Sequence, residues 1–584
     1  MSSETLLKKK NRKRKKTFLG NARKYAKKGC FGRGSKMDED TYQFFLRSLE
    51  TFNLGFDDEE LKVIFVDNVF EHTENQEIEC SSNQVGCRVI ETLLPFANDS
   101  ILQRFIEKFS SDLRPLIYDR FASFVLQQLV VVSSKKSLDL NLPEDKRTYY
   151  RKFALKVSKF LLNNLEDYTW DNIGNRVIRI CLCSLTQIPL ENKQNAKVTL
   201  DLHSAQKEEL PEEFIEVVRE FGQRLLLWPQ FNEMCFSELT SGLFQVLLKA
   251  LKKTDSKLLK QYLENLLNGT FVTLKNESEE GLVPQGFLSV SLVMLLETAL
   301  QVAGKKIFNL YLEKLFLRRM VKLACLKSTT FAVQKALAQC VNKEQFDPLF
   351  DELSDHFGEI IEKGHPAVIL TIGQTCKRLS SKQGLFIQNM LKTLNCHEPE
   401  ERLKHFITCM SRLTPFKENS PSNQNLAKER LNLQGTLMLQ LMLEFNKPIK
   451  IVNGLLAMDV QELRDLFSNS MGSHIVDSYV KSDFVGEKSR ERLIRKMTGT
   501  YQDLAASKYG SRSFEALWNA ANLKAKTQIM EELAYKEGSW SNTDFGRIIA
   551  SKVNLVLYKR SKEIWKNSVN NTAKPEKVLA DVLK

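Results

Sequence analysis

The sequence predicts an all-α fold, a curved α-solenoid of about eleven helical repeats that follows a disordered basic N-terminal tail. Three observations support this prediction. The chain has only 25 Gly and 14 Pro among 584 residues, too few for the many turns of an all-β fold. It is rich in Leu, Lys and Glu, which favour helix. A short pattern also recurs along most of the chain at a nearly constant step, as in helical repeat proteins.

The excess positive charge is concentrated at the N-terminus. Residues 1–36 contain fourteen Lys or Arg and one acid, a net charge of +13. The whole chain carries +14, so residues 37–584 sum to only +1 (14 − 13). Because like charges at this density repel one another, we expect residues 1–37 to form a disordered tail. This tail is expected to serve nuclear or nucleolar localisation, contact with RNA phosphates, or both. Its densest runs comprise Lys8, Lys9, Lys10, Arg12, Lys13, Arg14, Lys15 and Lys16.

Several classes of protein are not expected from this sequence. Its longest apolar run, near 124–132, falls short of the ~20 residues of a membrane span, so we expect no membrane partner. The eleven cysteines are scattered within helical patterns, as small buried residues are in a reducing compartment. Cys396, His397, His405 and Cys409 lack the paired spacing of a zinc site. No hydrolase, metalloprotease or kinase motif is present, so we expect neither an enzyme nor a cofactor.

The recurring pattern is a six-residue box, in which a small leading residue precedes five positions and positions three and four are usually apolar. Neighbouring boxes are 36 to 38 residues apart, a step that unrelated helices would not keep. Wider gaps contain polar, loop-like sequence at 133–146, 191–211, 268–284 and 414–428, which we expect to be insertions, with degenerate repeats as the alternative. The sequence therefore predicts a repeat region over 38–560 and a C-terminal tail over 561–584. Clear boxes begin at Gly86, Ala122, Gly174, Thr329, Gly435, Gly472 and Gly510, and weaker ones at Gly242, Leu292, Pro366 and Gly546.

Polar residues recur inside the boxes where a purely structural helix would be apolar. Positions one and five lie one turn apart on the same helix face, and position two lies about 100° round. A polar pair at positions one and five can hydrogen-bond a base edge, and a flat or long side chain at position two can stack on bases. The polar pairs are Cys87/Glu91, Ser123/Gln127, Thr330/Gln334, Thr436/Gln440, Ser473/Asp477 and Ser511/Glu515. Position two is occupied by Arg88, Phe124, Arg176, Phe331, Leu437, His474 and Arg512.

These boxes and their step resemble the repeats of the Pumilio (PUF) RNA-binding proteins over roughly residues 80–560. The resemblance implies that each box helix offers one base-reading pair and one stacking residue, with the RNA antiparallel to the protein. Ser511/Glu515 with Arg512 resembles the family's guanine-reading pattern, and Cys87/Glu91 with Arg88 is similar. Ser123/Gln127 with Phe124 resembles the adenine-reading pattern. Ser473/Asp477 with His474 departs from the guanine pattern through its shorter acid, and the two Thr/Gln pairs imply no firm base assignment.

Other boxes depart further from the family pattern. The box with Asn175 and Arg176 has Arg179 in place of an amide, a side chain better suited to a phosphate than to a base edge. Between about residues 240 and 370 the boxes lack the usual pairs, so this stretch is expected to read RNA weakly, touch structured RNA or contact protein. The atypical residues in these and the last box are Leu243, Leu247, Val293, Ala367, Thr371, Arg547 and Ser551.

About eleven boxes, long insertions and a basic tail are most similar to the nucleolar protein nine family. That resemblance implies a nuclear and nucleolar protein of small-subunit ribosome biogenesis, which binds pre-ribosomal RNA beyond the small-subunit rRNA and delays its cleavage. It also implies pre-ribosomal particle proteins as partners, and we expect a monomer. Two alternatives stay open: a protein-binding helical scaffold, which the near-neutral charge of residues 37–584 favours, and a Pumilio-type regulator of mRNA 3′-untranslated regions.

Overall fold

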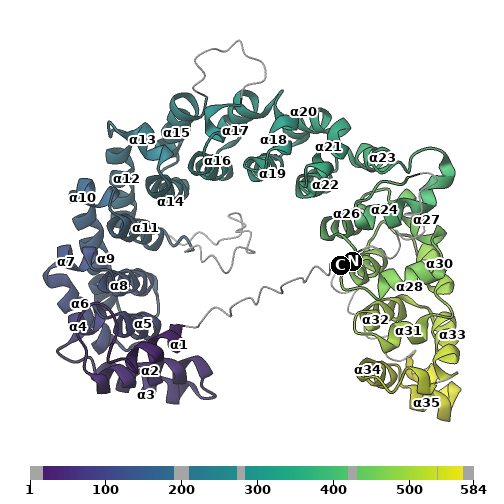
Figure 1. The fold of residues 1–584 in the computed structure, drawn as a ribbon, viewed down its shortest axis with the longest axis horizontal. Helices are drawn as coiled ribbons and strands as arrows, with labels where there is room; N and C mark the ends of the chain where they lie inside the picture. Colours follow the sequence, from purple (N-terminus) through teal and green to yellow (C-terminus); the bar gives the residue numbers. More distant parts are fainter. Residues whose placement is uncertain (1–17, 190–209, 273–282, 418–429, 536, 570–584) are drawn as a thin grey trace, which may run out of the picture. The chain divides into compact units, whose positions relative to one another are not determined.

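The computed structural model describes residues 18–189, 210–272, 283–417, 430–535 and 537–569 (Figure 1). Within these ranges the regular structure is helical, and the β-pairing recorded there is a single isolated bridge between Gly34 and Asn83. The predicted all-α fold is confirmed. The basic runs between Lys8 and Lys16 lie outside the described residues.

The chain divides into two compact units, the first made of residues 1–274 and 288–307 and the second of residues 275–287 and 308–584. In each unit the helices that carry the boxes, here called box helices, line up along one side (Figure 1). Those of the first unit are α5 (Gln84–Leu93), α8 (Ala122–Leu138), α11 (Asn172–Leu185), α14 (Glu238–Thr254) and α16 (Val290–Val302). Those of the second unit are α19 (Thr330–Gln339), α22 (Pro366–Leu379), α26 (Leu433–Leu443), α29 (Ser473–Lys481), α32 (Gly510–Ala520) and α34 (Asp544–Lys552).

Along the chain, most box helices come after a short helix and are followed by a further helix. The short helices are α4 (Glu77–Ser81), α7 (Leu113–Tyr118), α10 (Leu165–Thr169), α13 (Phe231–Phe236), α18 (Met320–Cys325), α21 (Phe357–Glu362), α24 (Phe406–Arg412), α28 (Val460–Phe467) and α31 (Tyr501–Ala506). The following helices are α6 (Asp99–Ser111), α9 (Glu144–Asn163), α12 (Glu212–Leu226), α15 (Ser256–Asn265), α17 (Lys305–Tyr311), α20 (Lys343–Leu353), α23 (Gln383–Thr393), α27 (Ile449–Ala457), α30 (Glu487–Lys496), α33 (Leu523–Ala534) and α35 (Leu555–Arg560). Short 3₁₀ or π segments, η1 to η7, cover 94–96, 266–271, 285–287, 312–316, 354–356, 400–405 and 537–539.

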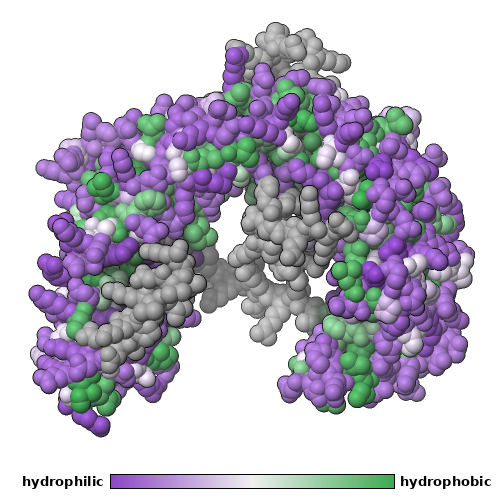
Figure 2. Space-filling view, turned by 180° about the vertical axis from the view of Figure 1, so that it is seen from behind, coloured by the Kyte–Doolittle hydropathy of each residue, from purple (hydrophilic) through white to green (hydrophobic). Residues whose placement is uncertain are grey.

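Apolar residues at box positions three and four form the core of most repeats, as the pattern predicts, whereas on α22 the buried pair is Val368 and Ile369 at positions two and three. Val125 and Leu126 are fully buried, and so are Ile475 and Val476. Each such side chain contributes roughly 1.5–3 kcal/mol relative to its exposed state. Hydrophilic side chains cover most of the face shown in Figure 2, with smaller apolar areas between them.

The prediction that residues 1–37 are disordered is wrong for residues 18–37. Residues Phe18–Ala26 form α1, which packs on α2 (Glu39–Leu54), ahead of α3 (Glu59–Glu71). The glycine-rich loop that follows α1 is held against the start of α5, where the amide of Ser35 donates to the Ser82 carbonyl at 3.1 Å and that of Gln84 to the Arg33 carbonyl at 2.8 Å. Charge density hid this order because it says nothing of the backbone bonds that hold the loop.

The predicted C-terminal tail and one predicted insertion also differ from the structure. Residues 562–569 are helical, and the fully buried Trp565 donates from its indole nitrogen to the Val553 carbonyl at 2.9 Å. The polar segment 133–146 is mostly helix, because α8 continues to Leu138 and α9 begins at Glu144. The other three predicted insertions lie largely outside the described residues.

Candidate nucleic-acid interface

In the boxes led by Gly86, Gly472, Gly510 and Gly546, the leading residue is small because it lies against a backbone carbonyl six residues earlier in the chain. A Cβ atom on Gly472 would lie 2.0 Å from the Leu466 carbonyl oxygen, and one on Gly546 would lie 2.0 Å from that of Trp540. A carbon atom normally stays about 3.3 Å or more from a carbonyl oxygen. Glycine at these positions therefore lets the box helix pack closely on the segment before it.

The residue three positions before the leading residue caps the box helix. Its side-chain oxygen accepts from a backbone N–H of the first turn, which satisfies a donor that the helix itself leaves open. These caps fix where each box helix starts and hence which box positions face outward. The capping residues are Asn83, Asp119, Asp171, Ser289, Asn432, Ser507 and Thr543.

On α14 the box begins at Thr240, two residues before the Gly242 that the sequence analysis took as its start. The Thr240 hydroxyl donates to the carbonyl six residues earlier, the contact of a leading residue. The hydroxyl of Ser241 then donates to the Ser291 carbonyl in the next repeat at 2.9 Å. The position-one thiol of Cys87 makes the equivalent bond to the Phe121 carbonyl at 3.1 Å.

Sequence reasoning therefore missed a polar pair on α14. Ser241 stands at position one, Gln245 at position five and Gly242 at position two, whereas Leu243 is fully buried core. Glycine is a small residue and misled the search for the leading position. The signal that could have found the true register is Ser237, the N-cap of α14 three residues before Thr240.

Position-one side chains of the seven clear boxes are at most 9% exposed and lie at the base of the surface. The hydroxyls of Thr330, Thr436 and Ser511 donate to carbonyls three residues earlier, at 3.3, 2.9 and 3.0 Å. Among the described residues, the buried hydroxyls of Ser123 and Ser473 have no hydrogen-bond partner. Most position-one polar groups are thus buried or bonded to backbone carbonyls, and the more exposed side chains of a box are those at positions two and five.

Position-two side chains project furthest from the box helices. Arg88, Arg176 and Arg512 are exposed, whereas Phe124 and His474 are half-buried. Phe331 is 67% exposed and Leu437 36% exposed, although both are large apolar side chains. Exposed flat groups at one helical position are suited to stacking on bases. We name the side of each unit formed by positions two and five the box surface.

The acidic position-five side chains are each paired with a cation. Glu91 pairs with Arg88 of its own box at 3.0 Å, and Asp477 lies 3.9 Å from the ammonium of Lys481. Glu515 on α32 instead pairs with Lys552 on α34 at 2.8 Å.

The amide position-five side chains are held differently. The Gln334 and Gln440 side chains each donate to the carbonyl at position one of their own box, at 3.2 Å. Gln127 is 5% exposed, and its amide nitrogen has no partner in the part of the chain described.

The boxes on α16, α22 and α34 present mixed surfaces. On α16 the position-two residue is Met294, 48% exposed, beside the buried Val293. On α22 the Thr371 hydroxyl donates to the Ala367 carbonyl at 3.0 Å. Arg547 and Ser551 on α34 are exposed, and Arg547 pairs with Asp544.

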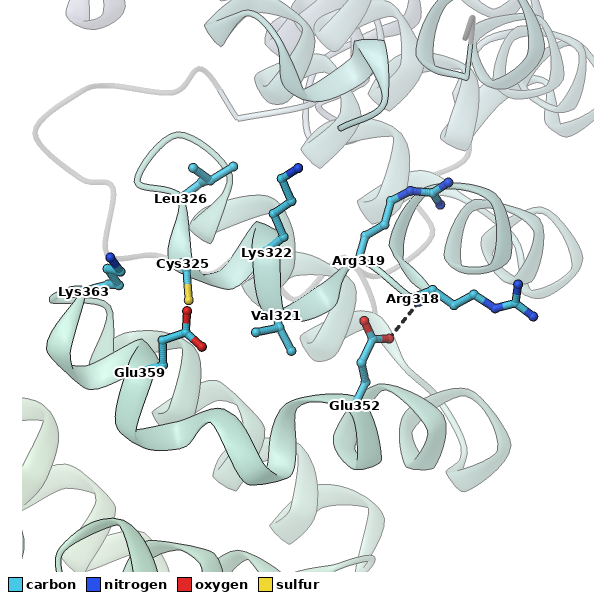
Figure 3. A pocket seen from close by; sticks show the side chains of 9 residues that line it. All are labelled: Arg318, Arg319, Val321, Lys322, Cys325, Leu326, Glu352, Glu359 and Lys363. Atoms are coloured by element: carbon cyan, nitrogen blue, oxygen red, sulfur yellow. Dashed lines mark hydrogen bonds between the residues drawn. The ribbon is translucent and has the colours of Figure 1, made fainter. Parts of the chain in front are cut away.

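A strongly basic segment lies in the second unit around α18 and α19. Residues 314–343 contain seven Lys or Arg and no Asp or Glu. Arg319 and Lys322 line a cavity together with Lys363, which follows α21, and the acids Glu352 and Glu359 line it as well (Figure 3). The carboxylate of Glu352 on α20 accepts from the backbone amide of Arg318 at 2.9 Å, so this acid is used to hold the turn before α18.

Membrane-spanning helices and metal-binding clusters are both absent from the ranges that the structure describes. No helix there is long and apolar enough to span a lipid bilayer. No group of three or more His, Cys, Asp or Glu side chains that could hold a metal gathers there either. Cys396 and Cys409 are buried next to each other, and the hydrogen bond from the Cys396 thiol lowers the pKa of Cys409.

A family model described as the NOP9-like PUF repeat domain matches residues 75–548. The chain belongs to this family. Its relatives include Nucleolar protein 9 of Homo sapiens, 24% identical, with 92% of this chain and 90% of the human protein covered. Pumilio homolog 23 of Arabidopsis thaliana is 21% identical, with 91% of this chain and 73% of that protein covered.

Among solved structures, APUM23–GGAGUUGACGG matches this NOP9-like PUF chain with a TM-score of 0.70 and 21% identity. The match covers 91% of this chain and 99% of that one. A second structure, APUM23–GGAAUUGACGG, gives the same TM-score at 20% identity. The PUF-repeat fold that the box spacing predicts is thus confirmed.

Proposed function

We propose that this chain is a nucleolar RNA-binding protein that binds pre-ribosomal RNA, single-stranded or partly folded, during small-subunit biogenesis. It acts as a monomer, by covering the RNA and so regulating its cleavage, without catalysis of its own. The observation that carries the proposal is the box surface, where exposed stacking groups at position two stand beside polar groups at position five. That combination suits unpaired bases, which can stack and hydrogen-bond at once. The names of the relatives and the RNA sequences of the APUM23 structures agree with it.

The proposed RNA contacts differ along the chain. Boxes with a polar pair read bases, and the box on α14 joins them through Ser241 and Gln245. The acid-free segment 314–343 supplies phosphate affinity without sequence preference, since Lys and Arg neutralise phosphates. The basic runs of residues 1–17 add phosphate affinity and a nucleolar localisation signal.

The first test is ultraviolet crosslinking of the full-length protein to RNA in its own cells, followed by sequencing of the recovered RNA. Reads concentrated in pre-ribosomal RNA next to the small-subunit rRNA would support the proposal. Reads spread over mRNA untranslated regions would replace it with a messenger regulator. Recovery of no RNA above background would leave a protein-binding scaffold.

A matched pair of variants tests base reading in vitro. Glu515→Gln removes a carboxylate from the box surface, and Glu531→Gln removes one from the exposed side of α33. Selection from a random RNA pool should give a changed base at a single position for Glu515→Gln, because one good pair discriminates by about 1–3 kcal/mol. Glu531→Gln should select the wild-type sequence. Identical sequences from both variants would refute base reading at this box.

A further inference from the structure

The box on α11 is built differently from its neighbours. The guanidinium carbon of Arg176 lies 4.2 Å above the centre of the Phe124 ring, although both are position-two residues of successive boxes. A base sandwiched between two flat groups requires them to stand about 7 Å apart, twice a van der Waals separation of about 3.5 Å. Arg176 therefore fills the place that a base would take between α8 and α11.

The other side of α11 also lacks a stacking site. Position two of the next box is Gly242, and a Cβ atom there would lie 2.9 Å from the Nη1 atom of Arg179. The missing side chain leaves room for the Arg179 guanidinium to lie against the backbone of α14. With no flat group on α14 and an arginine in place of the base-reading amide, this box cannot hold a base as its neighbours do.

The two arginines nevertheless form a cationic pair, in which Arg179 is half-buried and Arg176, although it packs on Phe124, remains exposed. Burial lowers the pKa of Arg176, and burial together with the charge of Arg176 lowers that of Arg179, yet a guanidinium remains protonated at neutral pH. In the part of the chain described, neither pairs with a carboxylate, and the buried Nε of Arg179 has no hydrogen-bond partner. The nearest acid, Glu91, is paired with Arg88. A partly buried charge without a partner is costly unless an anion joins it.

We propose that Arg176 and Arg179 hold one backbone phosphate of the bound RNA, so that the nucleotide at the α11 box is retained without its base being read. Guanidinium groups match the oxygens of a phosphate better than any other side chain does. The inference rests on the proposed function and adds a gap in the sequence preference, next to the base read by Ser123 and Gln127 on α8.

The test uses full-length protein and the RNA found by in-vitro selection. Each nucleotide is changed in turn to the other three bases, and the dissociation constant is measured between 50 and 200 mM salt. Wild-type protein should tolerate all four bases at one interior position. Arg179→Gln should bind RNA more weakly than the wild-type protein. The ratio of their two dissociation constants should fall about threefold across this fourfold salt range, because the loss of one phosphate contact on a single strand changes the salt slope by about 0.7. Arg179→Lys, which keeps the charge, should restore most of the slope.

The control is Lys260→Gln, which removes the same charge from the exposed surface of α15 in the same unit and should leave the salt slope unchanged. A wild-type salt slope for Arg179→Gln would overturn the proposal. So would discrimination between bases at every interior position by the wild-type protein. If the wild-type protein binds no RNA, both the proposed function and this inference fail. If it binds RNA but Arg179→Gln keeps the wild-type salt slope, only this inference fails.

Discussion

Substitution of the leading residue of a box tests the link between box sequence and helix packing. In Gly472→Ala the new Cβ atom would lie 2.0 Å from the Leu466 carbonyl oxygen, so the two segments must separate by about 1.3 Å to reach an ordinary contact of about 3.3 Å. Forced overpacking of this kind costs about 1–3 kcal/mol. At 1.4 kcal/mol per factor of ten, the local structure around α28 and α29 should open about 5 to 150 times more often.

Hydrogen–deuterium exchange measured by mass spectrometry on peptides from 460–481 reads this opening directly. The matched control is Gly384→Ala on α23 in the same unit, where nothing lies within 4 Å of the new Cβ atom. There alanine should leave exchange unchanged or slow it, because it favours helix over glycine by up to about 1 kcal/mol. Equal exchange in both variants would show that the leading glycine is not required for packing.

Three further predictions concern stability. Hydrogen bonds from two lysines and a tyrosine hold the pKa of Asp99 well below its ordinary value. The stability that this carboxylate adds to the fold is therefore fully present above the unfolded pKa of about 3.9, and it is lost as the pH falls toward the folded pKa. Urea titrations should therefore show Asp99→Asn less stable than wild type at pH 6, with a gap that narrows below pH 4. Deletion of residues 1–17 should leave the melting temperature unchanged, whereas deletion of residues 1–36 should lower it because α1 and the loop against α5 are lost. Trp565→Ala should cost about 3–5 kcal/mol locally and speed proteolysis of the last repeat, which limited trypsin digestion would detect.

The sequence was sufficient to predict the fold class and most boxes because the repeat pattern reflects local packing. Small leading residues and apolar pairs are needed wherever a box helix stacks, so they recur at a fixed step. Prediction failed where two nearby residues are both small enough to lead a box. On α14 these are Thr240 and Gly242, and only Thr240 lies three residues after the N-cap of the helix. It also failed at Trp565, whose burial depends on contacts that no periodicity reveals.

The site residues were predictable as types but not in their exposure. A helical wheel places positions one and five on one face, yet in the first box the structure buries Cys87 and leaves Glu91 half-exposed. The difference arises because position one also contacts the next box helix, as the Cys87 bond to the Phe121 carbonyl demonstrates. Such contacts between repeats depend on helix spacing, which a single sequence does not encode locally.

A nearly neutral repeat region can still bind a polyanion if its charges are sorted in space. Each acid at position five is paired with a cation, as Glu515 is with Lys552. These carboxylates therefore add little repulsion of the RNA phosphates. Cations are concentrated instead at Arg176 and Arg179 and along 314–343, a stretch of sequence that contains no Asp or Glu. RNA affinity and its salt dependence should therefore follow these local clusters rather than the net charge of +1, and neutralising either cluster should reduce the salt slope more than removing as many charges elsewhere.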